Sequence, residues 1–569
     1  MIFDAFSERI AQLTDMRQEE ILPLLTTPPN PEMGDAALPC FPFSKTMRKA
    51  PLAIAAELAG AFGQVEGIAR VEAVGGYLNA VADPAWVAGR VMTALAGAIG
   101  AGTLAQGSEG KGQVICLDYS SINIAKRFHI GHLSSTILGA ALNRVYKARG
   151  YATVSINHLG DWGTQFGKMI AAYRRWGDKG QVEAGGIDAL TALYQRFERE
   201  AAEDEALAAE GREWFRRMEE GDAEAMEIFN WFKEITLTDA NRLYAKLDIQ
   251  FDSYAGESFY SDKMQPVLDD LRRANLLKES QGAWVVDLED ESMPPCIILK
   301  QDGATLYATR DLAAALYRYQ TYHFDRCLYV VAYQQDLHFR QLFSVCRRLE
   351  YPFADKLEHV SYGMVRYEGE TLSTRRGHMV YLDDLLDRAV EKAGAILAEK
   401  NPDLANRQDV AAQVGIGAVV FSALLNNRIK DIDFWWDRAL NFDGETGPYV
   451  QYTHVRTLSV LRKGEMQPGQ AIAQPIDANL LTQAPAQAVL KQLAALDATL
   501  GAVVVRNEPY LLTRYLVDLA QKYNAFYYEL RMLDEDLTVR AARLALTDAV
   551  RATLQKGLAL LGIGAPEAM

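Results

Sequence analysis

Two histidines at a spacing of three, His129 and His132, flank Gly131 in the stretch NIAKRFHIGH. Lys126 and Arg127 precede them, so the stretch contains four potentially cationic groups. Imidazole and ammonium groups donate hydrogen bonds to phosphate oxygens, and residues three apart on a helix share a face. Gly131 lets a flat base approach the backbone closely because it has no side chain. We therefore interpret this stretch as a nucleotide-binding site rather than as ordinary histidines of a helix start.

The residues on either side predict a turn between a strand and a helix. QVICLDYS, residues 113–120, is a short apolar and β-branched run typical of a buried strand. After the histidines, one helix face is predicted by the spacing of Leu133, Ile137, Ala141, Val145 and Ala148. Such a turn lies at the carboxyl edge of a parallel sheet, where the free N–H groups of the helix start favour an anion.

Acidic and polar side chains after three further predicted elements form a second group of candidates. INHLGDWGTQFG (156–167) follows the second predicted strand, and carboxylates occur in FDSYAGES and LYATRDLAAALYR. Carboxylates at the mouth of a nucleotide site can receive a guanidinium, which forms paired bonds with them. Turn chemistry, or a first-turn acid favoured by a helix dipole, is the alternative. The candidates are Asn157, His158, Asp161, Gln165, Glu257, Tyr307, Asp311, Gln335 and His338.

A basic loop bounded by glycines, GETLSTRRGHMVYLDDLL (369–386), follows the strand candidate HVSYGMVRY. Hydroxyl and cationic groups in such a loop can close over a triphosphate and neutralise charge as pyrophosphate leaves. A charged turn is the alternative. The candidate side chains are Ser373, Thr374, Arg375 and Arg376.

Aromatic and cationic residues occur together in two helical segments near the end, GETGPYVQYTHVRTLSVLRK (444–463) and YNAFYYELR (523–531). Unpaired RNA bases stack on such rings and on Arg, although aromatic stripes on helices also form cores. We expect some of the tyrosines to pack inward and others to face RNA. The RNA-binding candidates are Tyr449, Tyr452, Arg456 and Tyr527.

Composition narrows the class of protein. The chain has 569 residues and a net charge of −15, and residues 196–227 alone hold twelve acids against five arginines. This acidity indicates a solvated helical segment and does not exclude RNA binding elsewhere. The five cysteines are scattered without ligand spacing, so neither bound zinc nor a disulfide framework is expected. Without a predicted membrane span or signal peptide, we expect a soluble cytoplasmic protein.

The order of elements predicts a multidomain α/β plus all-α chain. A small N-terminal α/β domain covers 1–112 and ends in the polar linker GTLAQGSEGKG. Residues 113–440 alternate strands and helices, which indicates a parallel, doubly wound sheet with a helical insertion at about 178–248. Residues 441–569 contain amphipathic helices only, such as the one through Leu516, Leu519, Tyr523 and Phe526, and predict a helical bundle.

These motifs resemble those of the bacterial-type arginyl-tRNA synthetases, a class I aminoacyl-tRNA synthetase family. NIAKRFHIGHLSST is similar to the family's HIGH signature. NHLGDWGTQFG, GES, LYATRD, QQDLHF, LSTRRG and GPYVQYTHVR follow in the family's order, and both ends, PPNPEMGDAALPCF and LLGIGAPEAM, are similar too. The resemblance covers essentially the whole chain.

The resemblance implies an architecture and a reaction. It implies an N-terminal domain that touches the tRNA elbow, a Rossmann-type catalytic domain and a helical anticodon-binding domain. ATP and L-arginine would form arginyl-adenylate and pyrophosphate, and the arginyl group would then pass to tRNA(Arg) with release of AMP. Members of this kind generally need tRNA for the first step. Mg²⁺ would accompany ATP, and the protein would be a monomer.

The resemblance also implies roles for individual residues. His129 and His132 would contact ATP and Gly131 its adenine. Asn123, Asn157 and Gln335, with His158 nearby, would hold the α-amino and carboxylate groups of arginine. Its guanidinium would be received by Glu257, Tyr307 and Asp311.

The chain departs from the family pattern in both signatures. Thr371 and Thr374 occupy the places of the two lysines of the family's KMSKS motif. In members that lack the second of these lysines, one upstream of the histidines is thought to substitute for it, and Lys126 occupies that place. Ile122 and Arg127 replace common prolines, and Ser134 replaces a frequent arginine. These replacements predict a less rigid loop.

Two other functions compete with an arginine ligase. A paralogue that binds tRNA without charging it is suggested by the altered LSTRRG loop. Another class I specificity, such as cysteine, is disfavoured because clustered zinc ligands are missing from the sequence. Purified protein in a charging assay with each amino acid separates these functions.

Overall fold

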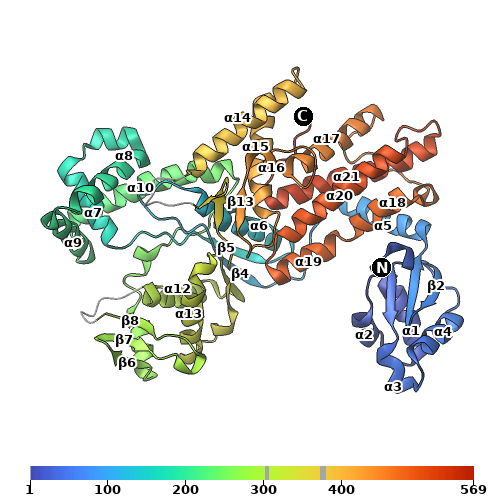
Figure 1. Ribbon diagram of the computed structural model, residues 1–569, viewed down its shortest axis with the longest axis horizontal. Helices are drawn as coiled ribbons and strands as arrows, with labels where there is room; N and C mark the ends of the chain where they lie inside the picture. The colour runs from blue at the N-terminus through green and yellow to red at the C-terminus, as the bar shows by residue number, and fades with distance from the viewer. Residues whose placement is uncertain (1, 301–306, 372–379) are drawn as a thin grey trace. The chain divides into compact units, whose positions relative to one another are not determined.

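The computed structural model describes residues 2–300, 307–371 and 380–569 (Figure 1). The chain divides into two compact units, each assembled from segments distant in sequence. The first contains residues 1–104, 453–496 and 518–554. The second contains residues 105–452, 497–517 and 555–569 and includes nearly all candidate site residues.

The N-terminal part of the first unit is an antiparallel sheet covered by helices. Its strand order is β1 (Ala36–Pro39), β3 (Tyr77–Ala82), β2 (Ile68–Val74). Helices α1 (Ile2–Thr14), α2 (Gln18–Ile21), α3 (Ser44–Met47) and α4 (Pro51–Ala61) accompany it, and α5 (Pro84–Gly100) follows. Phe6, Ile10, Leu58 and Leu78 are buried in its core. The predicted small α/β fold is therefore present, with α1 ending two residues before Met16 of the predicted periodicity.

The second unit is organised around a four-stranded parallel sheet. Its strand order is β10 (Leu357–His359), β9 (Arg326–Tyr329), β4 (Val114–Asp118), β5 (Ala152–Ile156). Cys116 lies opposite Val154 on one side and Cys327 on the other. The predicted helix after β4 is α6 (Leu133–Ala148). The predicted Rossmann-type arrangement is confirmed, with the candidate histidines between β4 and α6.

The sequence predicts that HVSYGMVRY forms one strand, but the structure divides this stretch between two strands. β10 ends at His359, and the chain turns before β11 (Val365–Tyr367), which joins β12 (Glu370–Thr371) and β13 (Ile432–Phe434) in a separate sheet. At this turn Gly363 packs against backbone, since a Cβ there would lie 2.4 Å from the carbonyl carbon of Lys430. The apolar residues of HVSYGMVRY gave no indication of this contact with Lys430, so the sequence did not predict the turn.

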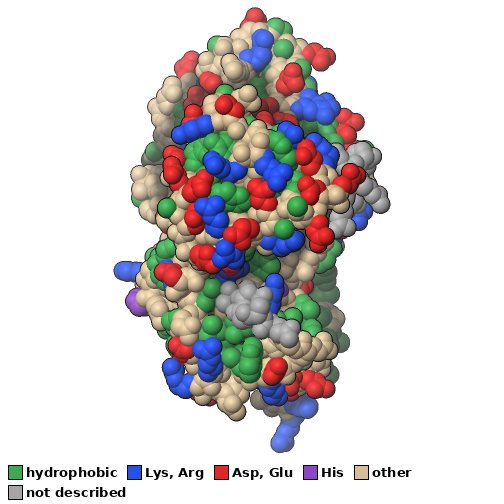
Figure 2. Space-filling model, turned by 90° about the vertical axis from the view of Figure 1, so that its left-hand side faces the viewer, with side chains coloured by type: hydrophobic (Ala, Val, Ile, Leu, Met, Phe, Trp, Pro, Cys, Tyr) green, Lys and Arg blue, Asp and Glu red, His purple; other side chains and the backbone are tan. Residues whose placement is uncertain are grey.

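The predicted insertion is helical. Its helices are α8 (Lys179–Ala201), α9 (Glu205–Glu219) and α10 (Ala223–Lys246), packed with α7 (Thr164–Trp176). Asp178, Asp204 and Asp222 cap the three starts with their carboxylates. Figure 2, which views the molecule from this side, shows acidic and basic side chains interspersed on the surface. The acidic excess of the sequence is thus a solvated face, as predicted.

One sheet of three short strands was not predicted from the sequence. β6 (Leu277–Ser280), β7 (Ala283–Val286) and β8 (Cys296–Leu299) form an antiparallel sheet. α11 (Gln265–Arg273) precedes it, and α12 (Tyr307–Tyr322) and α13 (Asp336–Arg348) follow it. Each of these strands has four residues, too few for a periodic signal.

The chain from residue 382 onward is helical apart from β13 among the described elements. The helices are α14 (Leu382–Lys400), α15 (Arg407–Leu424), α16 (Trp436–Ala439), α17 (Gly447–Lys463), α18 (Ala484–Ala494), α19 (Leu496–Arg506), α20 (Tyr510–Glu529) and α21 (Leu537–Leu561). Leu516, Leu519, Tyr523 and Phe526 of α20 are fully buried, as their spacing predicted. One stretch, Ala484–Arg506, is long and apolar enough to cross a membrane, with a mean hydropathy of 1.6. It comprises α18 and α19, whose apolar residues contribute to the protein core.

Replacing Gly167 by Ala should destabilise the insertion, because a Cβ there would lie 2.1 Å from the carbonyl oxygen of Gly211 in α9. Separating the two backbones should lower the free energy of unfolding by about 1–3 kcal/mol. Urea unfolding followed by circular dichroism measures this change. Gly180→Ala is the matched control, since its Cβ would meet only the Asp178 carboxylate at 3.4 Å. Equal midpoints for Gly167→Ala and the natural protein would contradict the packing argument.

Candidate functional site

The paired histidines are brought together as the sequence predicted. His132 ends the short 3-10 helix η4 (Ile130–His132) just before α6, His129 is the N-cap residue of η4, and the two ring centroids are 3.9 Å apart. The Gly131 N–H donates to Nδ1 of His129 (3.1 Å), and the His129 N–H donates to Nδ1 of His132 (3.3 Å). A ring whose Nδ1 accepts carries its proton on Nε2 when neutral. Both rings therefore offer an Nε2–H donor.

The electrostatics of this pair differ from the cationic cluster that the sequence suggested. Burial, followed by the charge of His129, lowers the pKa of His132 to about 3. Burial, followed by the charge of Lys126, lowers the pKa of His129 below its ordinary value. The two imidazoles are neutral donors near pH 7, because an imidazolium without a counter-charge is costly to bury. Lys126 is exposed, with Nζ 5.7 Å from the ring centroid of Tyr194.

Two candidate segments meet beside this pair. The Ile124 N–H donates to the Gly160 carbonyl (3.2 Å), and the Gly160 N–H donates to the Ile122 carbonyl (2.8 Å). A Cβ on Gly160 would lie 2.4 Å from Oδ1 of Asn123, so a larger residue at this crossing would displace the Asn123 side chain. The NHLGDWG loop is thereby fixed against the loop that precedes the histidines.

A second cluster contains the predicted acids. Asp311, in the first turns of α12, accepts from Nε2 of His338 at 2.7 Å, and Nε2 of His158 lies 3.8 Å away on its other oxygen. Glu257 begins the 3-10 helix η5 (Glu257–Tyr260), and its Oε2 lies 3.8 Å from Nη1 of Arg310. That oxygen and Nε of Arg310 are buried without a hydrogen-bond partner among the described atoms.

The two acids differ in their ionisation. Burial, reinforced by the charges of Asp311 and Asp161 and opposed by Arg310, raises the pKa of Glu257 to about 8. Burial acts on Asp311 in the same direction, but the hydrogen bond and charge of His338 outweigh it and lower the pKa. The same bond raises the pKa of His338 against the effect of burial. The cluster therefore holds one ionised carboxylate, Asp311, and one carboxyl, Glu257, that is largely protonated at pH 7.

Asp161 holds the position of Glu257 through contacts with the neighbouring residue, Ser258. Its fully buried carboxylate accepts from Nζ of Lys233 (2.6 Å) and from the backbone N–H (2.8 Å) and hydroxyl (2.7 Å) of Ser258. The Glu257 N–H donates to the Leu159 carbonyl (2.9 Å). Asp161, a candidate from the sequence, thus orients η5 and with it Glu257.

A buried ion pair connects the sheet to the acids. Nη2 of Arg318, in α12, lies 2.8 Å from Oδ2 of Asp118 at the end of β4, and the Arg318 side chain is 1% exposed. Nη2 also lies 3.3 Å from Nδ1 of His158. Because a guanidinium only donates, Nδ1 of His158 accepts and Nε2 carries its proton toward Asp311.

The other predicted arginine-site residues are placed less directly. Asn157 is fully buried, its Nδ2 donates to the Tyr244 hydroxyl (2.8 Å), and only its Oδ1 lacks a partner among the described atoms. Tyr307 begins α12 four residues before Asp311, on the same face, and is 63% exposed. Gln335 ends the 3-10 helix η7 (Tyr333–Gln335) with an exposed side chain.

The remaining predicted residues belong to other regions. Ser373, Thr374, Arg375 and Arg376 lie outside the described residues. Tyr449, half-buried, and Tyr452, exposed, lie on α17, where Gln451 between them is buried. Farther along this helix, the Arg456 guanidinium lies 5.1 Å from the ring centroids of both Tyr527 and Tyr528. Tyr523 packs inward, as expected for some of these tyrosines.

Sequence reasoning missed four residues that shape the acidic pocket: Asp118, Lys233, Arg310 and Arg318. Arg318 lies seven residues after Asp311 on an otherwise alanine-rich helix, and a cation at that spacing was an available signal. Lys233 offered no such signal, because it meets Asp161 only through the fold. The described residues contain no group of three or more His, Cys, Asp or Glu side chains that could hold a metal ion.

Comparisons with known proteins agree along the whole chain. Residues 95–436 match a family model described as "tRNA synthetases class I (R), catalytic domain". Residues 450–569 match the DALR anticodon binding domain, and residues 1–81 match the arginyl tRNA synthetase N terminal domain.

Relatives and a solved structure also match the chain over nearly its full length. The chain is 47% identical over 564 residues to the arginine–tRNA ligase of Alkaliphilus metalliredigens, covering 98% of each protein. It is also 47% identical over 558 residues to that of Clostridioides difficile, again covering 98% of each. The structure of Thermus thermophilus arginyl-tRNA synthetase superposes with a TM-score of 0.81 at 26% identity and covers 100% of both chains.

The neutral histidine pair predicts a specific titration behaviour. NMR of the imidazoles should find His132 uncharged down to pH 5, because its pKa is lowered to about 3. Lys126→Ala should move the pKa of His129 upward, since the lysine's charge contributes to lowering it. An imidazolium at either position at pH 7 would contradict the arrangement.

Proposed function

The chain belongs to the arginyl-tRNA synthetase family, and from that premise we propose how its site binds and activates arginine. It is a ligase that joins L-arginine to tRNA(Arg) at the expense of ATP, through arginyl-adenylate and with release of pyrophosphate and AMP. Membership rests on the family model, which matches residues 95–436, and on 47% identity over nearly the full length. The single observation in the site that supports arginine as substrate is that two acids, Glu257 and Asp311, lie close enough for the charge of Asp311 to raise the pKa of Glu257.

The guanidinium of arginine fits the chemistry of the acidic cluster. A planar cation with five donors can bind Asp311, which is ionised, and the free Oε2 of Glu257. Tyr307 lies on the same face of α12 and can cover the planar group. A site with buried acids left unpaired rejects a substrate lacking these donors by roughly 10⁴ or more. Arg310 is displaced or shared when the substrate guanidinium enters.

The other end of arginine is assigned by the family motifs. We propose that Asn123, Asn157 and Gln335 hold its α-amino and carboxylate groups, with His158 nearby. The free Oδ1 of Asn157 supports a role as acceptor for an ammonium group. Asn123 lies at the crossing with Gly160, next to the histidine segment, which suits a residue between amino acid and nucleotide.

The nucleotide belongs at the histidine pair. Two neutral Nε2–H groups can donate to phosphate oxygens without requiring a proton to be taken up, and Gly131 leaves room for adenine. Lys126 supplies the positive charge that stabilises the phosphates as pyrophosphate leaves. We assign Ser373, Thr374, Arg375 and Arg376 to the same phosphates from the sequence alone. Mg²⁺ would enter with ATP and be held by its phosphates.

The tRNA is assigned to the outer parts of the chain. We propose that residues 441–569 bind the anticodon region, with Tyr449, Tyr452, Arg456 and Tyr527 as stacking and cationic contacts. Residues 1–112 would contact the tRNA elbow, and residues 113–440 would hold the catalytic site. The exposed Tyr528, 72% accessible, joins these candidates because Arg456 lies over its ring. We further propose that the enzyme is a cytoplasmic monomer.

A charging assay tests the reaction. Purified protein with total tRNA, Mg²⁺ and ATP should accept arginine alone among the twenty amino acids, and ATP–pyrophosphate exchange should require tRNA. Lys126→Ala should slow exchange by roughly 10²-fold or more without weakening arginine binding. Lys168→Ala, which removes an exposed ion pair with Glu198, is the matched control and should have no effect. Binding of tRNA without any charging would contradict a ligase and indicate the binding paralogue instead.

Arginine binding should release a proton from Glu257. Because its pKa is raised to about 8, this carboxyl is largely protonated at pH 7, and pairing with a guanidinium requires the ionised form. Calorimetry in buffers of different ionisation enthalpy should detect roughly 0.9 proton per arginine at pH 7, falling as the pH rises through 8. Affinity for arginine should therefore weaken as the pH is lowered below about 8.

Variants separate the groups that face one another in this cluster. Glu257→Gln should abolish the release, whereas His338→Asn should retain it while weakening the orientation of Asp311. Arg310 and Asp161 stay in place in both variants and keep the local charge comparable. Unchanged proton release in Glu257→Gln would show that another group titrates.

A further inference from the structure

The segment carrying the histidines is joined by its backbone to the start of α14. The Ile130 N–H donates to the Val380 carbonyl (2.9 Å), and the Leu382 N–H donates to the Phe128 carbonyl (3.0 Å). These bonds place His129 and Tyr381 opposite each other in an antiparallel bridge. Any displacement of the first turn of α14 is therefore transmitted to the backbone of His129.

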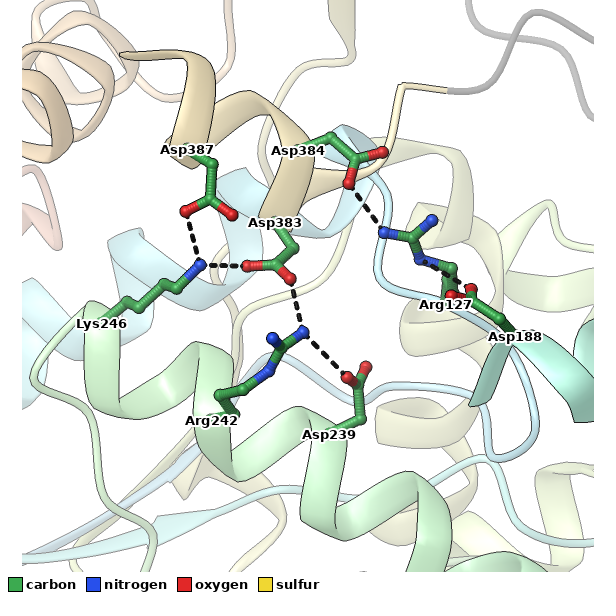
Figure 3. A network of polar contacts seen from close by, with 8 residues as sticks. All are labelled: Arg127, Asp188, Asp239, Arg242, Lys246, Asp383, Asp384 and Asp387. Carbon is green, nitrogen blue, oxygen red and sulfur yellow. Dashed lines mark hydrogen bonds and ion pairs between the residues drawn. The ribbon is translucent and has the colours of Figure 1, made fainter. Parts of the chain in front are cut away.

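Arg127 secures the same junction with its side chain. In Figure 3 its guanidinium lies between Asp384, from α14, and Asp188, from α8. Nη2 donates to Oδ1 of Asp384 (2.8 Å), and Nε lies 3.4 Å from Oδ1 of Asp188. The guanidinium carbon also lies 4.0 Å from the ring centroid of Tyr381. One side chain thus contacts the insertion, α14 and the bridging residue, while only 20% of it is exposed.

The same first turn of α14 is also held by α10. Asp383 accepts from Arg242 (2.5 Å) and from Lys246, and Lys246 also donates to Asp387 (2.7 Å), as Figure 3 shows. The Asp383 side chain is 16% exposed, so this is the more protected pair. Without Arg127, the described polar contacts between the helix start and the insertion would be those with α10, and its described hydrogen bonds to the histidine segment would be the two backbone bonds.

We propose that Arg127 is a positioning residue for His129 and His132: its contacts with Asp188, Asp384 and Tyr381 fix the histidine segment in the geometry that binds ATP. The proposal rests on the proposed function of these histidines as ATP-binding residues. Arg127 itself touches no reacting atom in this account. Because Phe128 is the only residue between Arg127 and His129, movement of the guanidinium reaches the imidazole pair through a short and bridged backbone.

Loss of Arg127 has an electrostatic consequence as well as a geometric one. Asp188 and Asp384, whose side chains are 69% and 61% exposed, would remain as uncompensated negative charges near a site for a polyanion. Like charge at this range disfavours the phosphates of ATP. Both effects act on ATP, whereas the acidic arginine pocket around Asp311 is built by other contacts and should be unaffected.

Steady-state kinetics of tRNA charging test the proposal. Arg127→Ala should raise KM for ATP roughly five- to tenfold and lower kcat, with KM for arginine unchanged. Arg127→Lys keeps the charge but loses the flat stacking on Tyr381, so it should recover only part of the loss. An inactive natural protein would refute the proposed function, whereas an active one with unchanged KM for ATP in Arg127→Ala would refute only the role of Arg127.

A second pair of variants separates positioning from charge. Asp384→Asn breaks the ion pair yet removes a negative charge, so positioning predicts a higher KM for ATP and a purely electrostatic role predicts a lower one. Arg217→Ala is the matched control, because Arg217 also stacks on an aromatic ring (Trp214, 4.0 Å) and pairs with two acids, Asp222 and Glu224. It lies within the insertion helices and should leave both KM values unchanged. A lower KM for ATP in Asp384→Asn, or equal effects of Arg217→Ala and Arg127→Ala, would overturn the proposal.

Discussion

The buried ion pair between Asp118 and Arg318 is the interaction on which the acidic cluster around Asp311 depends. It joins the end of the central strand β4 to α12, and neither side chain is accessible to more than 6%. A buried charge that loses its partner costs several kcal/mol, roughly 3–5, so both members are needed together. Arg318 also fixes the tautomer of His158, which faces Asp311. The charge distribution of the acidic cluster is thus determined partly by a contact at the end of the sheet.

Burial has opposite electrostatic effects on the histidine pair and on the acidic cluster. Around His129 and His132, burial removes positive charge and leaves donors, so in the proposed function hydrogen bonds and the exposed Lys126 would bind the adenylate end. Around Glu257 and Asp311, acids are gathered despite mutual repulsion, and cationic side chains offset it. The proposed ATP site, which has little buried charge, and the proposed acidic amino-acid site can therefore lie close together without cancelling each other.

Much of the fold could be predicted from sequence because its elements have strong periodic or apolar signals. β4, β5 and β9, helix α6 and the buried face of α20 were all anticipated. The short strands β6 to β8 and the division of HVSYGMVRY were not, since four-residue strands and a turn set by contact with Lys430 have no local pattern. In the site, motifs identified the acids and histidines. Their supports, such as Arg318 and Lys233, come from other elements and become visible only in three dimensions.

The salt bridge from Lys233 to Asp161 limits how much of the helical insertion could be deleted from this enzyme. Lys233 lies on α10, a helix of the insertion, whereas Asp161 lies beneath the residue that begins η5. The insertion therefore contributes a contact that the catalytic region needs and cannot simply be removed. A shortened enzyme lacking these helices would leave the buried Asp161 carboxylate, next to Glu257, without its ammonium partner, so modular reduction of this scaffold must first replace that ammonium group.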